Sequence, residues 1–374
     1  MKFPMKGTAL ALSTLLGAMV SAHAQSNVSI YGILDASVSY AKAAQSKTAL
    51  RSGDLLAQRL GFRGSEDLGS GLKASFMLEA GVSVDNGTGS ATNTNNQASG
   101  GTAAGALTFN RQSWVGLEGA WGALRLGRTF NPTYRQYIDF DPFGGGGLGA
   151  SQAAQSSLAT YGYNPWAVGL RHSNAVEYSL PAKGALTGQF MYAMGENASN
   201  ATTTINGTPT DISSDGNYLA GRLAYKFGQA QIGFAAGQMK NAAKKNVDEY
   251  VLGGKYALGD VVLMGMYSHS KEGIGTKQNG WLVGGTMRRN AMAYSLSLSG
   301  SQTKNSSGAS IGKSQKMAAL ARYHLSKRSS VYLLGVYTRN SDGANQVPLF
   351  ALTPADTAPN QNARAISVGL THVF

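Results

Sequence analysis

Apolar and polar residues alternate along most of this chain with a period of two. Between residues 28 and 40, Val28, Ile30 and Val38 fall on one face, while Ser29 and Ser37 fall on the other. A β-strand points successive side chains to opposite faces, so this period predicts strands with a single apolar face. The alternation predicts sixteen strands, at residues 28–40, 53–64, 72–84, 106–118, 121–129, 166–180, 185–195, 217–227, 229–239, 247–258, 261–271, 279–289, 291–303, 313–325, 329–340 and 363–374.

The connections between these strands decide between two architectures. Alternation alone fits a soluble two-sheet sandwich and a membrane barrel equally well. Links after even-numbered strands are short, as at 227–229 and 258–260, whereas links after odd-numbered strands are mostly longer and polar, as at 85–105 and 341–362. Outer-membrane barrels sort their connections in this way. The prediction is an all-β, 16-stranded antiparallel transmembrane β-barrel with short periplasmic turns and long external loops.

The two ends of the chain fit an exported barrel. Residues 1–24 combine Lys2 and Lys6 with an apolar stretch and a closing Ala-His-Ala triplet, which predicts a secretory signal peptide. The stretch falls short of the about 20 apolar residues that a membrane helix needs. We therefore expect a barrel domain over 25–374. At the other end, the alternation runs to Phe374, so the last strand is expected to pair with the first and close the barrel.

Aromatic residues fall near the ends of the predicted strands. A transmembrane barrel places aromatic girdles at both membrane interfaces, so these residues are expected to face outward there. The residues in question are Tyr40, Trp121, Trp166, Trp281, Tyr323 and Phe374.

Composition narrows the possible chemistry. The chain has no Cys, and its five His are far apart in the sequence, so we expect no metal site, no cofactor and no thiol chemistry. The net charge is +13, but the Lys and Arg residues are spread along the chain without a basic run beside stacking aromatics. Nucleic acid is therefore not an expected partner.

Five segments carry a resemblance to a known family. Together they resemble the general porins of Gram-negative outer membranes, especially the β-proteobacterial type. The resemblance implies a homotrimer in the outer membrane, in contact with membrane lipid and lipopolysaccharide. Each barrel would hold a water-filled channel for passive diffusion of ions and small hydrophilic solutes, narrowed by its third external loop. The segments are 29–40, 58–81, 111–128, 171–181 and 368–374.

The predicted constriction loop spans about 130–165. This segment lies in the longest stretch without clear alternation, and long ordered loops are usually functional. The resemblance implies that it folds into the lumen. Its glycine run at 144–147 lacks the following Lys-Ser/Thr and the helix of a phosphate-binding loop. The run instead predicts a backbone that packs closely against the barrel wall.

The resemblance assigns a basic cluster to Arg59, Arg128 and Arg171. Alternation places Arg59 on a face with Arg63, and Arg171 on a face with Glu177. Arg128 instead shares the parity of apolar residues, so its side chain reaches the lumen only at a strand end or a β-bulge.

The resemblance matches Asp139 and Asp141 loosely to the acidic side of the constriction, although no Glu follows Pro142. Three arginines against two acids predict a weak to moderate anion preference. Further residues expected to face the lumen are Asp35, Arg63, Lys73 and Glu79.

Three other functions stay open at this point. Tyr134, Tyr137, Tyr161 and Tyr163 could form a sugar-stacking track in a substrate-specific channel. A barrel enzyme would need a catalytic group such as His172 with Ser173, but neighbouring strand residues point to opposite faces, so we expect no enzyme. An adhesin would have a filled lumen.

Overall fold

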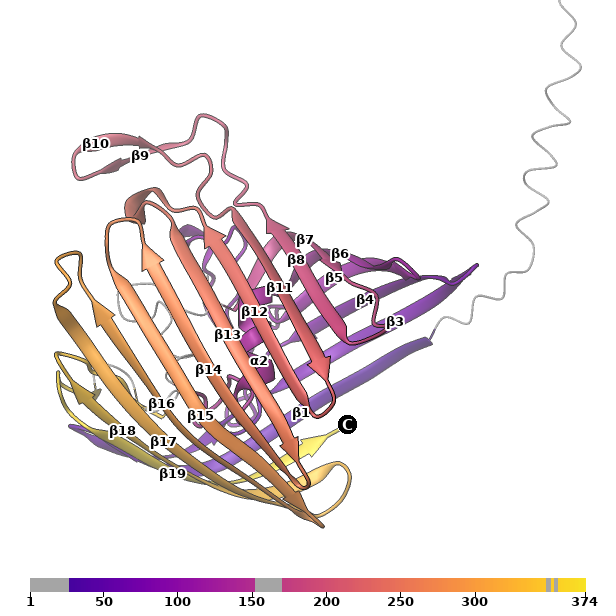
Figure 1. The fold of residues 1–374 in the computed structure, drawn as a ribbon, viewed down its shortest axis with the longest axis vertical. Coiled ribbons are helices and arrows are strands. Elements are labelled where there is room, and N and C mark those ends of the chain that lie inside the picture. Colours follow the sequence, from indigo (N-terminus) through magenta and orange to yellow (C-terminus); the bar gives the residue numbers. More distant parts are fainter. Residues whose placement is uncertain (1–26, 152–169, 348–350, 353–355) are drawn as a thin grey trace, which may run out of the picture.

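The computed structural model describes residues 27–151, 170–347, 351–352 and 356–374, which form a closed antiparallel barrel (Figure 1). The predicted signal peptide lies outside the described residues. So do residues 152–165 of the predicted constriction loop, with Tyr161 and Tyr163, and Trp166. Within the described ranges, no helix is long and apolar enough to cross a membrane.

Sixteen strands close the barrel, and each pairs with its neighbours in antiparallel register, as the alternation predicts. The short turns gather at one end of the barrel, here called the short-turn end, and the longer connections at the other, the long-loop end. The strands are β1 (Asn27–Lys42), β3 (Arg59–Gly69), β4 (Leu72–Ala80), β5 (Gln112–Gly119), β6 (Gly122–Phe130), β7 (Arg171–Ser179), β8 (Leu186–Ala193), β11 (Tyr218–Phe227), β12 (Ala230–Met239), β13 (Val247–Leu258), β14 (Val261–Glu272), β15 (Lys277–Arg289), β16 (Met292–Lys304), β17 (Ser310–His324), β18 (Ser329–Ser341) and β19 (Ala363–Val373).

Among the strands, the largest differences from the prediction are at three places. The second strand, expected at 53–64, is divided into an additional strand β2 (Ser46–Ser52) along β1 and the barrel strand β3, and residues 53–58 lie between them. The fourth strand begins at Gln112 instead of residue 106. A hairpin of β9 (Thr202–Ile205) and β10 (Thr208–Asp211) extends beyond the strand ends at the long-loop end (Figure 1).

Pairing of the last strand with the first closes the barrel, as expected. The β1–β19 register runs from Ile33 opposite Val373 to Lys42 opposite Arg364. Beyond it, the Gly32 N–H donates to the Phe374 carbonyl at 3.0 Å, and the Phe374 N–H donates to the Gly32 carbonyl at 3.1 Å. No strand edge remains at this seam. An open edge would cost several kcal/mol for each unpaired backbone group in hydrocarbon.

Alternate residues of the closing strand face opposite environments. Ile366, Val368 and Leu370 point outward and are 50%, 59% and 50% exposed, whereas Ser367 and Thr371 are fully buried on the inner face. The closing strand is thus apolar on its outer face and mostly polar on its inner face. The outward aromatic residues expected at the strand ends are indeed exposed where the structure describes them; these are Tyr40, Trp121, Trp281, Tyr323 and Phe374.

A helix that the alternation did not predict lies inside the barrel. Helix α2 (Pro132–Phe140) follows β6, and Asn131 caps it by accepting the Tyr134 N–H at 2.7 Å (Figure 1). Its buried face packs Tyr137 and Phe140 against the inner wall at β13 and β14. Gly253 leaves room for the Phe140 ring, because a Cβ there would overlap it. The described part of the predicted constriction loop therefore lies in the lumen.

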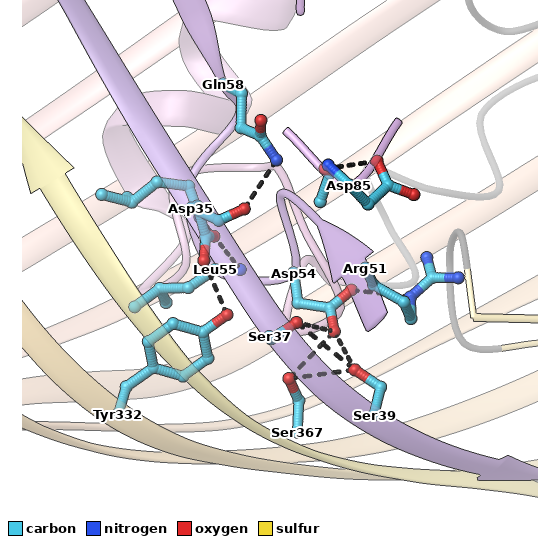
Figure 2. Close-up of polar contacts among 12 residues, drawn as sticks. Asp35, Ser37, Ser39, Arg51, Asp54, Leu55, Gln58, Asp85, Tyr332 and Ser367 are labelled. Atoms are coloured by element: carbon cyan, nitrogen blue, oxygen red, sulfur yellow. Dashed lines mark hydrogen bonds and ion pairs between the residues drawn. The ribbon is translucent and has the colours of Figure 1, made fainter. Parts of the chain in front are cut away.

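Two buried carboxylates hold residues 53–58 against the inner wall. Asp35 accepts the N–H groups of Leu55 and Leu56 at 2.8 and 2.7 Å and the Tyr332 hydroxyl at 2.8 Å (Figure 2). Asp54 accepts hydrogen bonds from three wall hydroxyls and from an arginine. This inward turn explains why the second strand is interrupted. The donors to Asp54 are Ser37, Ser39, Ser367 and Arg51.

The constriction loop is attached both to that segment and to the nearby strand β17. The Leu148 N–H donates to the Asp54 carbonyl at 2.8 Å. From β17, the buried Lys316 ammonium donates to the Leu148 carbonyl and, at 2.9 Å, to the Ala150 carbonyl. Gly147 has a φ of +69° and passes so close to the Asp54 carbonyl that a side chain would collide with it. The glycine run thus permits close packing of the loop.

The seam generates a first prediction. Gly32→Ala should destabilise the folded barrel by about 1–3 kcal/mol, because the new Cβ would lie 2.8 Å from the Arg59 carbonyl and closer still to the Phe374 ring. The measurement is the urea dependence of the heat-modifiable electrophoretic shift of the refolded protein. Gly335→Ala is the control, because nothing lies within 4 Å of a Cβ there. Equal midpoints for both variants would contradict the seam as described.

The loop attachment generates a second prediction. Lys316→Met should weaken the attachment of the loop by about 1–3 kcal/mol, because two buried carbonyls lose their donor. Amide hydrogen exchange in 141–151 should accelerate accordingly while exchange in β17 stays slow. Lys313→Met, on the outward face of the same strand, is the matched control. Unchanged exchange in Lys316→Met would show that the ammonium does not hold the loop.

Candidate pore constriction

The first basic group surrounds Glu79 on β4. Arg111 Nε lies 2.7 Å from Glu79 Oε1, Arg59 Nη1 lies 3.6 Å from Glu79 Oε2, and the Tyr31 hydroxyl donates to Oε2 at 2.9 Å. All four side chains come from neighbouring strands or their ends, which the register brings together on the inner face. Arg63 follows on the same face of β3 and lies over the Tyr31 ring at 5.1 Å. One carboxylate therefore meets two guanidinium groups.

Arg128 lies at an irregularity of the barrel wall. The register between β6 and β7 shifts between Gly127 and Thr129, and Gly127 has a φ of +132°. The Arg128 guanidinium is buried and donates to the Asn110 carbonyl at 2.6 Å, the Asn93 carbonyl at 3.1 Å and Ser173 Oγ at 2.9 Å. A bulge thus places Arg128 against the connection from β4 to β5, and no carboxylate neutralises it among the described residues.

Arg171 lies in the same region as Arg128, but simple alternation along β7 does not explain its position. Two residues of β7, Ser173 and Asn174, lie opposite the single Arg128. The alternation of side chains along β7 is therefore interrupted between His172 and Ala175. At the strand end, the Arg171 guanidinium lies over the Phe130 ring at 4.0 Å, and the residue is only 7% exposed. Burial of a guanidinium without a carboxylate partner is compensated in part by this cation–π contact.

The two groups form one electrostatic unit. The charge of Arg171 interacts with those of Arg111, Arg128 and Glu79, and the charge of Arg59 interacts with that of Arg111. Four arginines against one glutamate leave a formal excess of +3. Sequence reasoning missed Arg111. Arg111 is the first residue of the segment 111–128, and its neighbour Gln112 pairs with Glu79. Its position in that segment could have identified it.

Both aspartates expected on the acidic side of the constriction are bound within the lumen. Asp139, on α2, forms an ion pair with Arg222 of β11. Asp141 is buried and accepts the N–H groups of Phe143 and Ser151, each at 2.8 Å. Burial raises the pKa of the Asp141 carboxyl, and those two N–H groups and Lys316 oppose the shift. Asp139 is therefore balanced by an arginine, whereas Asp141 is held in a buried position by backbone N–H groups.

A second set of ion pairs lies further along the inner wall. Glu177 of β7 pairs with Arg125 at 2.9 Å and with Arg135 of α2 at 3.7 Å. Arg125 also lies over the Trp114 ring at 4.7 Å. Two arginines against one glutamate leave a formal excess of +1 here, which has the same sign as the larger excess at the four-arginine cluster. Sequence reasoning did not single them out as site residues.

Other residues singled out in the sequence have different surroundings. Lys73 is exposed near the short-turn end, and Asp35 serves the inward segment described above. Tyr134 donates to the Gly145 carbonyl and Tyr137 to Glu249, and both tyrosines are buried. They pack within the lumen instead of presenting their rings to a solute.

His172 and Ser173 form no dyad. The His172 ring is buried and stacks on Tyr218, whereas Ser173 Oγ donates to the Asn93 carbonyl at 2.6 Å. Among the described residues, no group of three or more His, Cys, Asp or Glu side chains could hold a metal ion.

Relatives span the whole chain. Outer membrane porin protein 32 of Delftia acidovorans is 29% identical over 387 residues, which cover 99% of this chain and 100% of the relative. An outer membrane porin of Bordetella pertussis is 26% identical over 425 residues, with coverage of 99% and 100%.

Solved structures agree with the architecture. An anion-selective porin from Comamonas acidovorans matches with a TM-score of 0.77 at 27% identity, covering 94% of this chain and 100% of that one. OmpT of Vibrio cholerae, at 13% identity and a TM-score of 0.63, shares the fold. A family model described as Gram-negative porin matches residues 8–343. The chain therefore belongs to the Gram-negative porin family, and its barrel is an outer-membrane channel with periplasmic turns and external loops.

Proposed function

We propose that this porin is a passive diffusion channel with a preference for anions, set by Arg59, Arg111, Arg128 and Arg171. The observation that carries the proposal is the excess of +3 in this cluster, while of the two loop aspartates Asp139 is paired with Arg222 and Asp141 is buried against backbone N–H groups. The relative described as anion-selective supports it. Small hydrophilic solutes and ions cross down their gradients, and no catalytic step is involved.

The physical mechanism is electrostatic selection at a narrow, wet point. A 16-stranded barrel leaves an aqueous channel, and α2 with the following loop narrows it from one side. Fixed positive charges beside low-dielectric walls raise the local concentration of anions and lower that of cations. Arg is suited to this place because its charge persists at any physiological pH.

The structure gives less support to the other functions. Tyr134 and Tyr137, half of the suggested sugar track, are buried against the lumen wall. The side chains of His172 and Ser173 bind different partners, which argues against a hydrolase at this position. We therefore infer a channel without enzymatic activity.

The same proposal includes the assembly. We infer a homotrimer in the outer membrane, in contact with lipopolysaccharide, on the strength of membership in the family. The outward face of the barrel, with Leu219 and Val368 exposed by 64% and 59%, is apolar enough for either lipid or a neighbouring subunit.

A third prediction tests the role of the arginines. In Arg59→Gln with Arg171→Gln, the chloride-to-potassium permeability ratio should fall roughly threefold to tenfold. One unit charge about 6 Å away in water contributes about 0.7 kcal/mol to the energy of an ion. The measurement is the zero-current potential of single channels across a planar bilayer under a KCl gradient.

The matched control has the same change in net charge outside the pore constriction. Arg289 and Arg328 are exposed at the short-turn end, so replacing both by Gln should leave the potential unchanged. At about 1 M salt, where the Debye length falls to about 3 Å, the difference between wild type and the lumen variant should shrink. A wild-type channel that prefers potassium would overturn the proposal.

A further inference from the structure

The ring of Phe130 contacts both an arginine of the pore cluster and the helix of the constriction loop. Phe130 is the last residue of β6 and lies directly opposite Arg171 in the register with β7. The guanidinium carbon of Arg171 lies 4.0 Å from the centre of the ring. The Tyr134 ring of α2 stacks on Phe130, with 5.5 Å between the two centroids. Side chains from two neighbouring strands and from the helix therefore meet at this ring.

Oxygen atoms hold the three other arginines of the cluster. Arg59 and Arg111 both form ion pairs with Glu79. Arg128 donates to two backbone carbonyls and to one hydroxyl. Hydrogen bonds are directional, so each of these contacts fixes the orientation of a guanidinium as well as its position.

Arg171 has no such oxygen partner among the described residues. Its guanidinium forms neither a hydrogen bond nor an ion pair there, although the residue is only 7% exposed and its Nε is buried. A buried polar group without a hydrogen bond is costly and uncommon in folded proteins. A planar guanidinium can instead be stabilised over the face of an aromatic ring. The contact that holds this guanidinium is therefore the one with Phe130.

The bulge in the barrel wall places the ring on the inner side. Phe130 has the parity of Leu126, which points outward and is 48% exposed. It reaches the lumen because the register shifts between Gly127 and Thr129. There it packs beside the buried apolar residues of α2, and the next residue, Asn131, caps that helix. Strand and helix thus both fix the backbone that carries the ring.

The contact with the ring also affects the field at the constriction. The charge of Arg171 interacts with that of Glu79 as well as with those of Arg111 and Arg128. A guanidinium released from the ring is free to turn toward Glu79, and its charge would then be partly compensated. An aromatic face attracts the cation without supplying a neutralising charge. Phe130 therefore holds Arg171 in place and leaves its full charge available to passing anions.

We propose that Phe130 is the positioning residue for Arg171, and that its aromatic face sets the strength of the anion preference through this arginine. The inference rests on the proposed function, because it takes Arg171 as one of the charges that select anions. The role of the ring is to hold a charge that the solute meets. An aliphatic side chain of similar size would also pack against Tyr134, but it would not attract a guanidinium.

The test separates the aromatic character of the ring from its volume. Phe130→Leu removes the aromatic face, and Phe130→Tyr keeps it. Replacement of Phe130 by a trifluorinated phenylalanine keeps the shape but removes most of the negative potential of the face. The zero-current potential of single channels is measured for each variant across a planar bilayer under a KCl gradient. Phe190→Leu is the matched control, because Phe190 of β8 points outward and is 45% exposed.

We expect the chloride-to-potassium permeability ratio to fall about twofold in Phe130→Leu and in the trifluorinated protein. This is less than the loss of a unit charge would give, because the charge moves but stays in the lumen. Phe130→Tyr and Phe190→Leu should keep the wild-type ratio. A wild-type ratio in Phe130→Leu or in the trifluorinated protein would overturn the proposal.

A double-mutant cycle separates a direct effect on Arg171 from a displacement of α2. In the Arg171→Gln background, Phe130→Leu should change the ratio no further, because the ring then has no charge to position. An equal fall in that background would overturn the proposal, since the ring would then act through the helix.

Two further points keep the result separate from misfolding and from the proposed pore function. The heat-modifiable shift on electrophoresis shows which variants have formed the barrel. The trifluorinated ring matches the shape of phenylalanine, so it tests the proposal even where Phe130→Leu does not fold. A wild-type channel that prefers potassium would contradict the anion-selective pore, whereas the cycle would still show whether Phe130 acts through Arg171.

Discussion

Every backbone N–H and C=O that lies at membrane depth must find a partner within the protein, and this requirement shapes the whole molecule. Sixteen strands meet it only if the last pairs with the first, which the two hydrogen bonds between Gly32 and Phe374 complete at the seam. Closure separates two environments across one layer of backbone. Alternate residues must then suit hydrocarbon on one side and water or polar groups on the other, which is why the pattern of period two runs through the chain.

Closure also creates an interior in which apolar packing and polar contacts together hold the loop, because Leu148 and Phe140 pack against apolar patches of the inner wall. Much of the inner wall is polar, so the segment at 53–58 and the loop after α2 are also attached through charged and hydroxyl groups. Asp35, Asp54 and Lys316 each bond to backbone groups or hydroxyls of elements distant in the sequence. A buried charged group without a partner would destabilise the folded protein. Because these groups have partners, they hold the loop at one position. These contacts fix the position of the loop in the lumen, and the loop position sets the width of the channel.

How far the sequence could predict this arrangement depends on the range of the interactions. Local alternation predicts the number of strands, the closure of the barrel and the faces of Arg59 and Phe374. It does so because each strand has hydrocarbon on one face and the lumen on the other. Arg128 could be assigned only by resemblance, because its parity is wrong until the register shifts beside Gly127. The anchor on Lys316 had no sequence signal, since its partner Leu148 is 168 residues away. Helix α2 and the inward turn at 53–58 likewise depend on contacts across the lumen.

The excess of basic residues, 32 Lys and Arg against 19 Asp and Glu, has two physical uses in this fold. Inside, arginines predominate, and several lie over aromatic rings, as Arg171 does over Phe130 and Arg125 over Trp114. A planar guanidinium can be fixed against a ring while keeping its charge, which suits a site that must present charge at a constant position. Outside, exposed basic residues such as Lys271, Lys277 and Lys313 are lysines, whose long flexible stems can lie along apolar surface while the ammonium group stays in water. The same formal charge is therefore held at a fixed position in the lumen and on a flexible stem at the outer surface.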